Sequence, residues 1–172
     1  MTAAERRSSN LRWQANQSGR FRRDPTLVAD FSSVLLVEDN PGDVELTKRA
    51  LQQGPLLNHL HVVRDGNSAL QALRNSDERT GGFAMILLDL NLPGMSGFDV
   101  LRELKADREL RRIPVMMLTT SSRRADIDKA YELGAASYVV KPVELARYVE
   151  IMSTIEAYRI QTVRLPTPSR SR

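Results

Sequence analysis

Four short apolar runs in this chain each end at a polar residue that can take part in chemistry. The runs are 34–37, 85–88, 115–118 and 138–140. The residues that follow them are Glu38-Asp39, Asp89, Thr119-Thr120 and Lys141. Continuous runs of this length, rich in Val, Ile, Leu and Met, are typical of strands buried on both faces. The sequence therefore predicts a buried sheet whose strands end in acids, hydroxyl groups and an ammonium group.

Helical patterns alternate with the runs. Asn40-Pro41 has the residues of an N-cap followed by proline at the first helical position, and this helix is expected to stop at Gly54-Pro55. Ser121 or Ser122 is expected to cap a later helix that Gly134 ends. The remaining expected elements are a strand at 60–63 and helices near 69–73, 98–104 and 144–160. Five strands alternating with five helices predict an α/β fold with a five-stranded, doubly wound parallel sheet.

The last expected helix carries two apolar groups of residues. The expected core stripe is Leu145, Val149, Met152 and Ile155 or Glu156. Ile151 and Tyr158 fall largely outside that stripe, and Tyr148 lies at its edge. Two interpretations stay open: a broad buried face, or an interaction face for self-association or for a partner kinase.

The basic residues are concentrated at the two ends of the chain. Residues 1–30 hold six Arg against three acids, and residues 164–172 hold three Arg and no acid. The whole chain has a net charge of +4, so the segment between the ends is slightly acidic. We expect an Arg-rich extension over 1–32, a folded domain over 33–160 and a tail over 161–172. Such ends can contact nucleic acid or a membrane surface, but a solvated tail is the more ordinary interpretation.

Composition excludes several kinds of site. Cysteine is absent, which excludes disulfides, thiolate chemistry and Cys-ligated metals. No apolar stretch approaches the roughly 20 residues that span a bilayer, and the N-terminus lacks the apolar core of a signal peptide. We therefore expect a soluble cytoplasmic protein without a membrane partner.

In doubly wound sheets, ligands bind outside the carboxyl ends of the strands, near the point where the strand order reverses. If strands 34–37 and 85–88 are neighbours, then Glu38, Asp39 and Asp89 share one pocket. Two unit charges about 4 Å apart repel by about 4 kcal/mol at an effective dielectric of about 20. Either a carboxyl group takes up a proton or a cation binds. All-oxygen ligands favour Mg²⁺ or Mn²⁺.

Lys141 and Thr119 complete a set of groups suited to phosphate chemistry. Lys141 offsets part of the negative charge and can hold an incoming anion, and Thr119 supplies a hydroxyl donor. A carboxylate nucleophile, Mg²⁺, a lysine and a threonine are the groups required for in-line phosphoryl transfer onto an aspartate.

Over residues 33 to about 160 the chain resembles the receiver domain of two-component response regulators. It is most similar to the small stand-alone receivers associated with phytochrome-type sensor kinases. The motifs that carry the resemblance are 37–43 (VEDNPGD), 89–94 (DLNLPG), 118–121 (LTTS) and Lys141-Pro142. The resemblance implies a flavodoxin-like (βα)5 fold.

The resemblance also implies a role for each matching residue. Asp89 is then the phosphoacceptor. Asp39 ligates Mg²⁺ directly, Glu38 acts through a bound water, and Asn91 offers its backbone carbonyl. Thr119 and Lys141 bind the phosphoryl oxygens. Thr119 and Tyr138 form the conformational switch, and the Lys141-Pro142 peptide bond is cis.

The expected function is that of a single-domain response regulator and not of an enzyme. It would take a phosphoryl group from a sensor histidine kinase, of the phytochrome type by resemblance, and signal through its fourth helix, fifth strand and fifth helix. A homodimer is a further expectation that the sequence leaves open. One alternative is a transcription regulator acting through the basic tails, although no helix-turn-helix pattern is present. The other is a Mg²⁺-dependent aspartyl-phosphate hydrolase, although no insertion offers a cap over the site.

Overall fold

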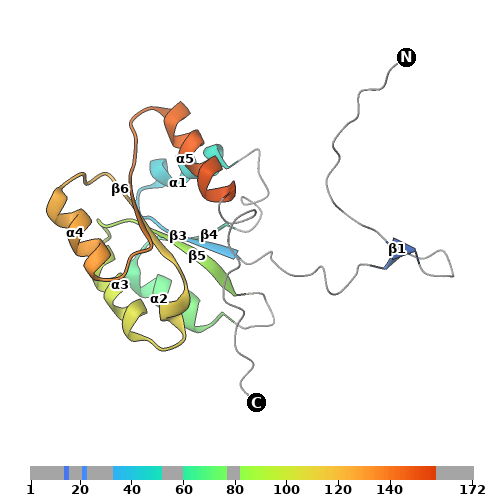
Figure 1. Cartoon of the computed structure of the whole chain (residues 1–172), viewed down its shortest axis with the longest axis horizontal. Coiled ribbons are helices and arrows are strands. Elements are labelled where there is room, and N and C mark those ends of the chain that lie inside the picture. Colours follow the sequence, from blue (N-terminus) through green and yellow to red (C-terminus); the bar gives the residue numbers. More distant parts are fainter. Residues whose placement is uncertain (1–13, 16–20, 23–32, 52–59, 77–81, 158–172) are drawn as a thin grey trace. The chain divides into compact units, whose positions relative to one another are not determined.

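The computed structural model describes residues 14–15, 21–22, 33–51, 60–76 and 82–157 of the chain. The chain divides into two units, Met1–Phe31 and Ser32–Arg172. In the first unit, strands β1 (Gln14–Ala15) and β2 (Phe21–Arg22) pair in antiparallel fashion. The second unit holds the main sheet and all the described helices (Figure 1).

The main sheet has five strands in the order β4-β3-β5-β6-β7, and every neighbouring pair is parallel. The strands are β3 (Ser33–Val37), β4 (Leu60–Val63), β5 (Phe83–Leu88), β6 (Val115–Thr119) and β7 (Ser137–Val140). The strand order reverses between β3 and β5, so this is the point at which doubly wound sheets bind their ligands. The predicted parallel, doubly wound sheet is confirmed.

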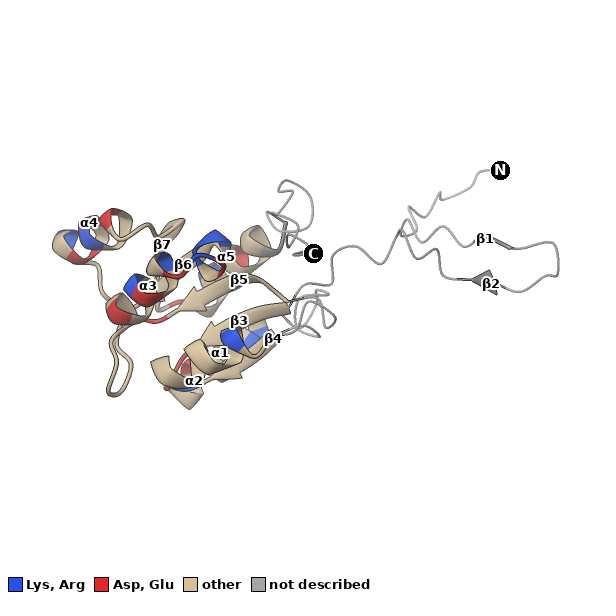
Figure 2. Cartoon of the chain, turned by 90° about the horizontal axis from the view of Figure 1, so that it is seen from below, with Lys and Arg blue, Asp and Glu red and all other residues tan. Residues whose placement is uncertain are grey.

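Helices cover both faces of this sheet (Figures 1 and 2). The helices are α1 (Pro41–Ala50), α2 (Gly66–Arg74), α3 (Gly97–Ala106), α4 (Arg124–Glu132) and α5 (Leu145–Ala157), with a 3₁₀ turn η4 (Leu110–Arg112) after α3. Alternate residues of each central strand point to opposite faces. Leu35 and Ile86 pack in a core with α2, α3 and α4, whereas Leu36 and Leu87 pack in a second core with α1 and α5. This burial on both faces explains why the strand sequences are apolar without alternation.

The helix boundaries agree with the sequence at α1 and differ at the start of α4. The Asn40 side chain accepts from the Gly42 and Asp43 amides, and Pro41 opens α1, as predicted. The helix α4 begins after Arg123 without a side-chain cap, so the predicted cap at Ser121 or Ser122 is wrong. The Ser121 hydroxyl instead donates to the Asp126 carboxylate at 2.5 Å. Gly54-Pro55, the predicted stop of α1, lies outside the described residues.

The buried stripe of α5 is rotated from the predicted one. Tyr148, Met152 and Ile155 are buried, whereas Leu145 is 49% exposed. The prediction placed Leu145 in the core because the stripe was drawn through apolar residues at helical spacing. Tyr148 is buried because its hydroxyl finds a partner in α1, which the sequence of α5 alone does not show. Tyr158 lies outside the described residues.

That partner is Thr47, whose hydroxyl lies 2.7 Å from the Tyr148 hydroxyl inside the core between α1 and α5. The Thr47 hydroxyl also donates to the Asp43 carbonyl oxygen at 2.8 Å. Because Thr47 has one hydroxyl proton and uses it on this carbonyl, the Tyr148 hydroxyl is the donor in the contact between the two side chains.

We expect Thr47→Val to lower the free energy of unfolding by about 2 kcal/mol and Tyr148→Phe to lower it by about 1 kcal/mol. The first variant leaves the buried Tyr148 hydroxyl without a partner, whereas the second leaves the Thr47 hydroxyl bonded to the Asp43 carbonyl. Chemical denaturation of both variants measures the difference, with the free energy of unfolding assumed to fall with denaturant concentration at the same slope in each. A larger loss for Tyr148→Phe would contradict this assignment of donor and acceptor.

No helix in the described segments is both long enough and apolar enough to span a lipid bilayer.

Candidate functional site

Three carboxylates meet at the reversal point of the sheet. Glu38 and Asp39 follow β3, and Asp89 follows β5. Each of the three offers an oxygen within 4.8 Å of the other two. The Glu38 amide donates to the Val63 carbonyl, and the Asp89 amide to the Val37 carbonyl, so the ladder hydrogen bonds of neighbouring strands fix these backbones. The structure thus brings together the three acids that the sequence placed in one pocket, with Glu38 and Asp89 buried and Asp39 exposed.

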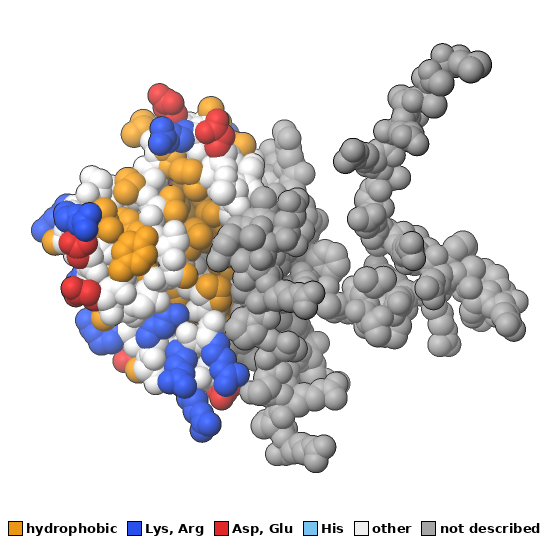
Figure 3. Space-filling view, viewed as in Figure 1, with side chains coloured by type: hydrophobic (Ala, Val, Ile, Leu, Met, Phe, Trp, Pro, Cys, Tyr) orange, Lys and Arg blue, Asp and Glu red, His pale blue; other side chains and the backbone are white. Residues whose placement is uncertain are grey.

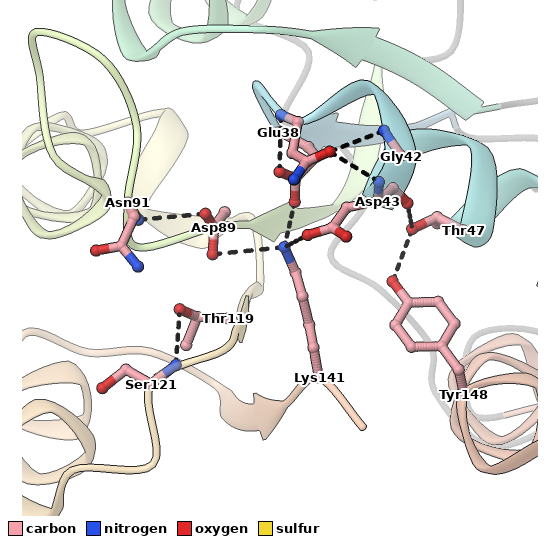
Figure 4. A network of polar contacts seen from close by, with 11 residues as sticks. Glu38, Gly42, Asp43, Thr47, Asp89, Asn91, Thr119, Ser121, Lys141 and Tyr148 are labelled. Carbon is pink, nitrogen blue, oxygen red and sulfur yellow. Dashed lines mark hydrogen bonds and ion pairs between the residues drawn. The ribbon is translucent and has the colours of Figure 1, made fainter. Parts of the chain in front are cut away.

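Lys141 reaches this cluster from the end of β7 (Figure 4). Its ammonium group donates to the Glu38 carboxylate and, at 2.8 Å, to Asp43 Oδ2. The Lys141 Nζ atom lies 3.7 Å from Asp89 Oδ1. The side chain of Lys141 is only 5% exposed, and burial alone would lower its pKa. The hydrogen bonds to Asp43 and Glu38 and the charge of Asp89 outweigh burial, so the pKa is raised and the group stays charged.

The cluster has a surplus of negative charge. One ammonium group faces the carboxylates of Glu38, Asp43 and Asp89, and Asp39 lies beside them. Burial raises the pKa of Glu38 despite the hydrogen bond from Lys141. Asp89 Oδ1 is buried and, among the described residues, accepts no hydrogen bond. A buried carboxylate oxygen without a donor, next to two more acids, fits a divalent cation with oxygen ligands.

Two glycines shape the loop that follows Asp89. A Cβ atom on Gly97 would lie 2.2 Å from the Asp89 carbonyl oxygen, so only glycine lets α3 begin against this backbone. Gly94 has φ +75°, a conformation that L side chains rarely adopt. The Asn91 amide, in the same loop, donates to Asp89 Oδ2 at 3.3 Å. The loop therefore fixes the Asp89 carboxylate and keeps the Asn91 backbone next to it.

Thr119 and Tyr138 lie on the side of the site formed by β6 and β7. Thr119 is fully buried, and its hydroxyl oxygen accepts from the Ser121 amide at 3.4 Å. The half-buried Tyr138 donates its hydroxyl to the Ser121 carbonyl oxygen at 3.0 Å. Ser121 thus joins the two residues that the resemblance implies as a switch. Burial raises the pKa of Tyr138, so its hydroxyl is protonated at neutral pH.

The expectation of a cis Lys141-Pro142 bond is wrong in this structure, where every described peptide bond is trans. Residue Lys141 is held in register by its amide, which donates to the Thr119 carbonyl at 2.7 Å.

Sequence reasoning missed Asp43 as a member of the site. Asp43 lies in the first turn of α1, where an acid is already explained by the helix dipole. The only further signal was its place in the motif 37–43, four residues after Asp39. Its contact with Lys141 joins residues 98 positions apart, which local patterns cannot show.

Apolar side chains are exposed on the face between α4 and α5 (Figure 3). The large exposed apolar residues among the described ones are Tyr131, Val140, Val143 and Leu145. They belong to α4, to β7, to the segment that joins β7 to α5 and to the start of α5. This is the face that the resemblance implies for signalling.

Comparisons with known proteins agree with this geometry. The family model described as response regulator receiver domain matches residues 34–153. The chain is 37% identical over 135 residues to the response regulator Rcp1 of Synechocystis sp., a match covering 77% of this chain and 92% of that protein. The structure of the phosphorylated cyanobacterial phytochrome response regulator RcpA is 37% identical, with a TM-score of 0.72 and coverage of 80% of this chain and 99% of that chain. The structure of the Mn²⁺-bound form of response regulator Rcp1 is 36% identical, with a TM-score of 0.69 and coverage of 78% and 99%.

Proposed function

We propose that this chain, which belongs to the response regulator receiver domain family, accepts a phosphoryl group on Asp89 from a sensor histidine kinase. Members of this family are signalling proteins, and the proposal assigns the acceptor and its helpers in this chain. One observation carries it: Asp89 Oδ1 is buried, accepts no hydrogen bond from the described residues, and lies 3.7 Å from the Lys141 ammonium.

Glu38, Asp39 and Asp89 would hold Mg²⁺ or Mn²⁺, with the Asn91 backbone carbonyl as a further ligand. The distances among the three acids and the surplus of negative charge support this proposal, as does the Mn²⁺-bound form of the relative Rcp1. A divalent cation bound here neutralises charge on the phosphoryl oxygens.

Asp89, Lys141 and Thr119 would each have a separate role in the transfer. An oxygen of Asp89 forms a bond to phosphorus while the phosphorus–nitrogen bond of the kinase phosphohistidine breaks. The Lys141 ammonium binds one phosphoryl oxygen and the Thr119 hydroxyl donates to another. Thr119 ends β6 and Lys141 directly follows β7, so the backbones of both residues lie at the same edge of the sheet as Asp89.

Incubation with a small phosphodonor and Mg²⁺ tests the proposal. We expect the intact mass to rise by one phosphoryl group per chain, and not to rise when a chelator removes divalent cations, because the surplus charge of the cluster repels the donor. Mn²⁺ should replace Mg²⁺, since both take oxygen ligands. Uptake that is unaffected by the chelator would contradict the proposed cation site.

For the signalling step, we propose that Thr119 moves toward the phosphoryl group and that Tyr138 changes its rotamer in response. Ser121 would couple the two, since its amide donates to Thr119 and its carbonyl accepts from Tyr138. The outer face of α4, β7 and α5 would change with them and be recognised by a partner. The exposed apolar residues of that face support this assignment.

We propose a phytochrome-type histidine kinase as the partner, on the basis of the phytochrome response regulator among the relatives. A homodimer through the exposed apolar face, a cytoplasmic location and the absence of membrane and nucleic-acid partners are further parts of the proposal. The protein would act as a signalling switch and not as an enzyme. The transcription-regulator alternative depends on the basic ends, which lie almost entirely outside the described residues.

A further inference from the structure

We propose that Asp43 is a positioning residue, which holds the Lys141 ammonium group in place for phosphoryl transfer. In the same proposal, the Thr47–Tyr148 hydrogen bond fixes the turn of α1 that carries Asp43. This inference rests on the proposed phosphorylation of Asp89. It assigns a role to a side chain that lies outside the three-acid cluster.

The contacts of Lys141 divide into those with the cation-binding cluster and one outside it. Its ammonium donates to Glu38 and Asp43 and lies near Asp89. Glu38 and Asp89 both belong to the cluster that fits a divalent cation, and Asp43 does not. When Glu38 turns to a cation and Asp89 carries a phosphoryl group, Asp43 is the carboxylate that can keep its contact with Lys141.

Asp43 is itself held in place by hydrogen bonds of its backbone. Its amide donates to the Asn40 side chain, and its carbonyl oxygen accepts from the Thr47 hydroxyl. The Thr47 oxygen in turn accepts from the fully buried Tyr148 hydroxyl. One turn of α1 is therefore fixed both at its start and against α5.

Helix α1 meets the segment 141–148 at two contacts, of which one is partly buried and the other is buried. These are Lys141 with Asp43 and Tyr148 with Thr47, and Figure 4 shows them side by side. The residues of each pair are about 100 positions apart in sequence. The ammonium end of Lys141 is thereby held by α1, while its backbone amide donates to the Thr119 carbonyl of β6.

Loss of the Asp43 charge should displace the ammonium. A lysine side chain has a flexible four-carbon stem, and its ammonium forms hydrogen bonds without directional rigidity. Without Asp43 the ammonium is drawn toward Glu38 and Asp89. There it competes with the divalent cation and is no longer positioned to bind a phosphoryl oxygen. Displacement of a catalytic group by about 1 Å can cost up to about 100-fold in rate.

The test compares Asp43→Asn with Glu45→Gln in the full chain. Glu45 is a matched control, since it lies on the same helix, loses the same charge and pairs with Arg49 on the surface with 55% of its side chain exposed. At saturating Mg²⁺ and with a small phosphodonor, we expect Asp43→Asn to be phosphorylated about tenfold more slowly and Glu45→Gln within about twofold of wild type. Asp43→Glu, which keeps the charge, should recover most of the rate.

A second readout reports on Lys141 directly. The ¹⁵N resonance of its ammonium group, recorded without phosphodonor, should shift in Asp43→Asn and stay unchanged in Glu45→Gln. Tyr148→Phe should shift it in the same direction and slow phosphorylation by about threefold, because the turn that carries Asp43 is less fixed. A merely structural role of Asp43 would lower stability without moving this resonance.

The inference is overturned if wild type gains a phosphoryl group and Asp43→Asn does so at the same rate. It is equally overturned if Asp43→Asn is slow while the Lys141 resonance does not move. If wild type gains no phosphoryl group at all, the proposed function of Asp89 fails, and this inference fails with it.

Discussion

Asp89→Asn is expected to abolish phosphoryl uptake completely while leaving the fold intact. Uptake is lost because an amide oxygen is not a nucleophile for phosphorus under these conditions. The fold is kept because asparagine has nearly the same shape as aspartate. In intact-mass measurements with a small phosphodonor and Mg²⁺, the variant should therefore keep its original mass. Persistent uptake by Asp89→Asn would place the acceptor at another acid, and Asp39 would be the first to examine.

The same variant should be as stable as wild type or up to about 1 kcal/mol more stable in the absence of Mg²⁺. It removes one carboxylate from a cluster in which a single ammonium faces several acids. Mg²⁺ should stabilise the variant less than wild type, because the cluster loses a ligand. Asp128→Asn, at an exposed acid of α4 paired with Arg124, is the matched control and should behave as wild type in both measurements.

The sequence contains enough local information to predict the sheet and the acids at its edge. Strands buried on both faces must be apolar throughout, so β3, β5 and β6 stand out as short continuous runs. Parallel strands also carry the residues that follow them to one edge of the sheet. Glu38, Asp39 and Asp89 could therefore be grouped before any contact between β3 and β5 was known.

The parts that sequence reasoning missed depend on packing between helices. The rotation of α5 about its axis is set by a hydroxyl pair, Thr47 and Tyr148, whose members lie 101 positions apart. The cap of α4 was misplaced because the helix begins at Arg124, later than the serines suggest. The Ser121 hydroxyl donates to the Asp126 carboxylate, and its oxygen accepts from the Arg123 amide, which lies before the first turn of α4. A hydrogen bond to a charged acceptor is stronger than one to a neutral acceptor, and a sequence pattern does not show that Asp126 comes within reach.

Lys141→Met is expected to lower the free energy of unfolding by about 3–5 kcal/mol at neutral pH, because it leaves buried carboxylates without the lysine ammonium that pairs with them. Methionine keeps the apolar stem of the lysine and removes only the charge and its hydrogen bonds. Glu38 and Asp43 both lose a donor, and Asp89 loses its nearest positive charge. Lys48→Met, at an exposed position of the same helix as Asp43, should change stability by about 0.5 kcal/mol or less.

Mg²⁺ should recover more stability in Lys141→Met than in wild type, since the ion then has no ammonium to displace. Phosphoryl uptake should nevertheless stay strongly reduced, because the cation does not replace the hydrogen bonds from Lys141 to the phosphoryl oxygens. Equal stabilisation of both proteins by Mg²⁺ would show that the ion binds away from this ammonium.

The stability lost in Lys141→Met should depend on pH with a definite sign. Burial already raises the pKa of Glu38 above its usual value of 4.5, although Lys141 opposes the shift. A carboxyl group with a raised pKa in the folded state binds its proton more tightly there than in the unfolded chain. Its protonated form therefore favours folding, and this contribution is lost as pH rises from 4.5 through the raised value.

Without Lys141 the opposing effect is gone, so the stability deficit of Lys141→Met relative to wild type should shrink between about pH 7 and about pH 5. Chemical denaturation of both proteins across this range measures the deficit, and a deficit that grows toward acid pH would rule out unpaired carboxylates as its cause.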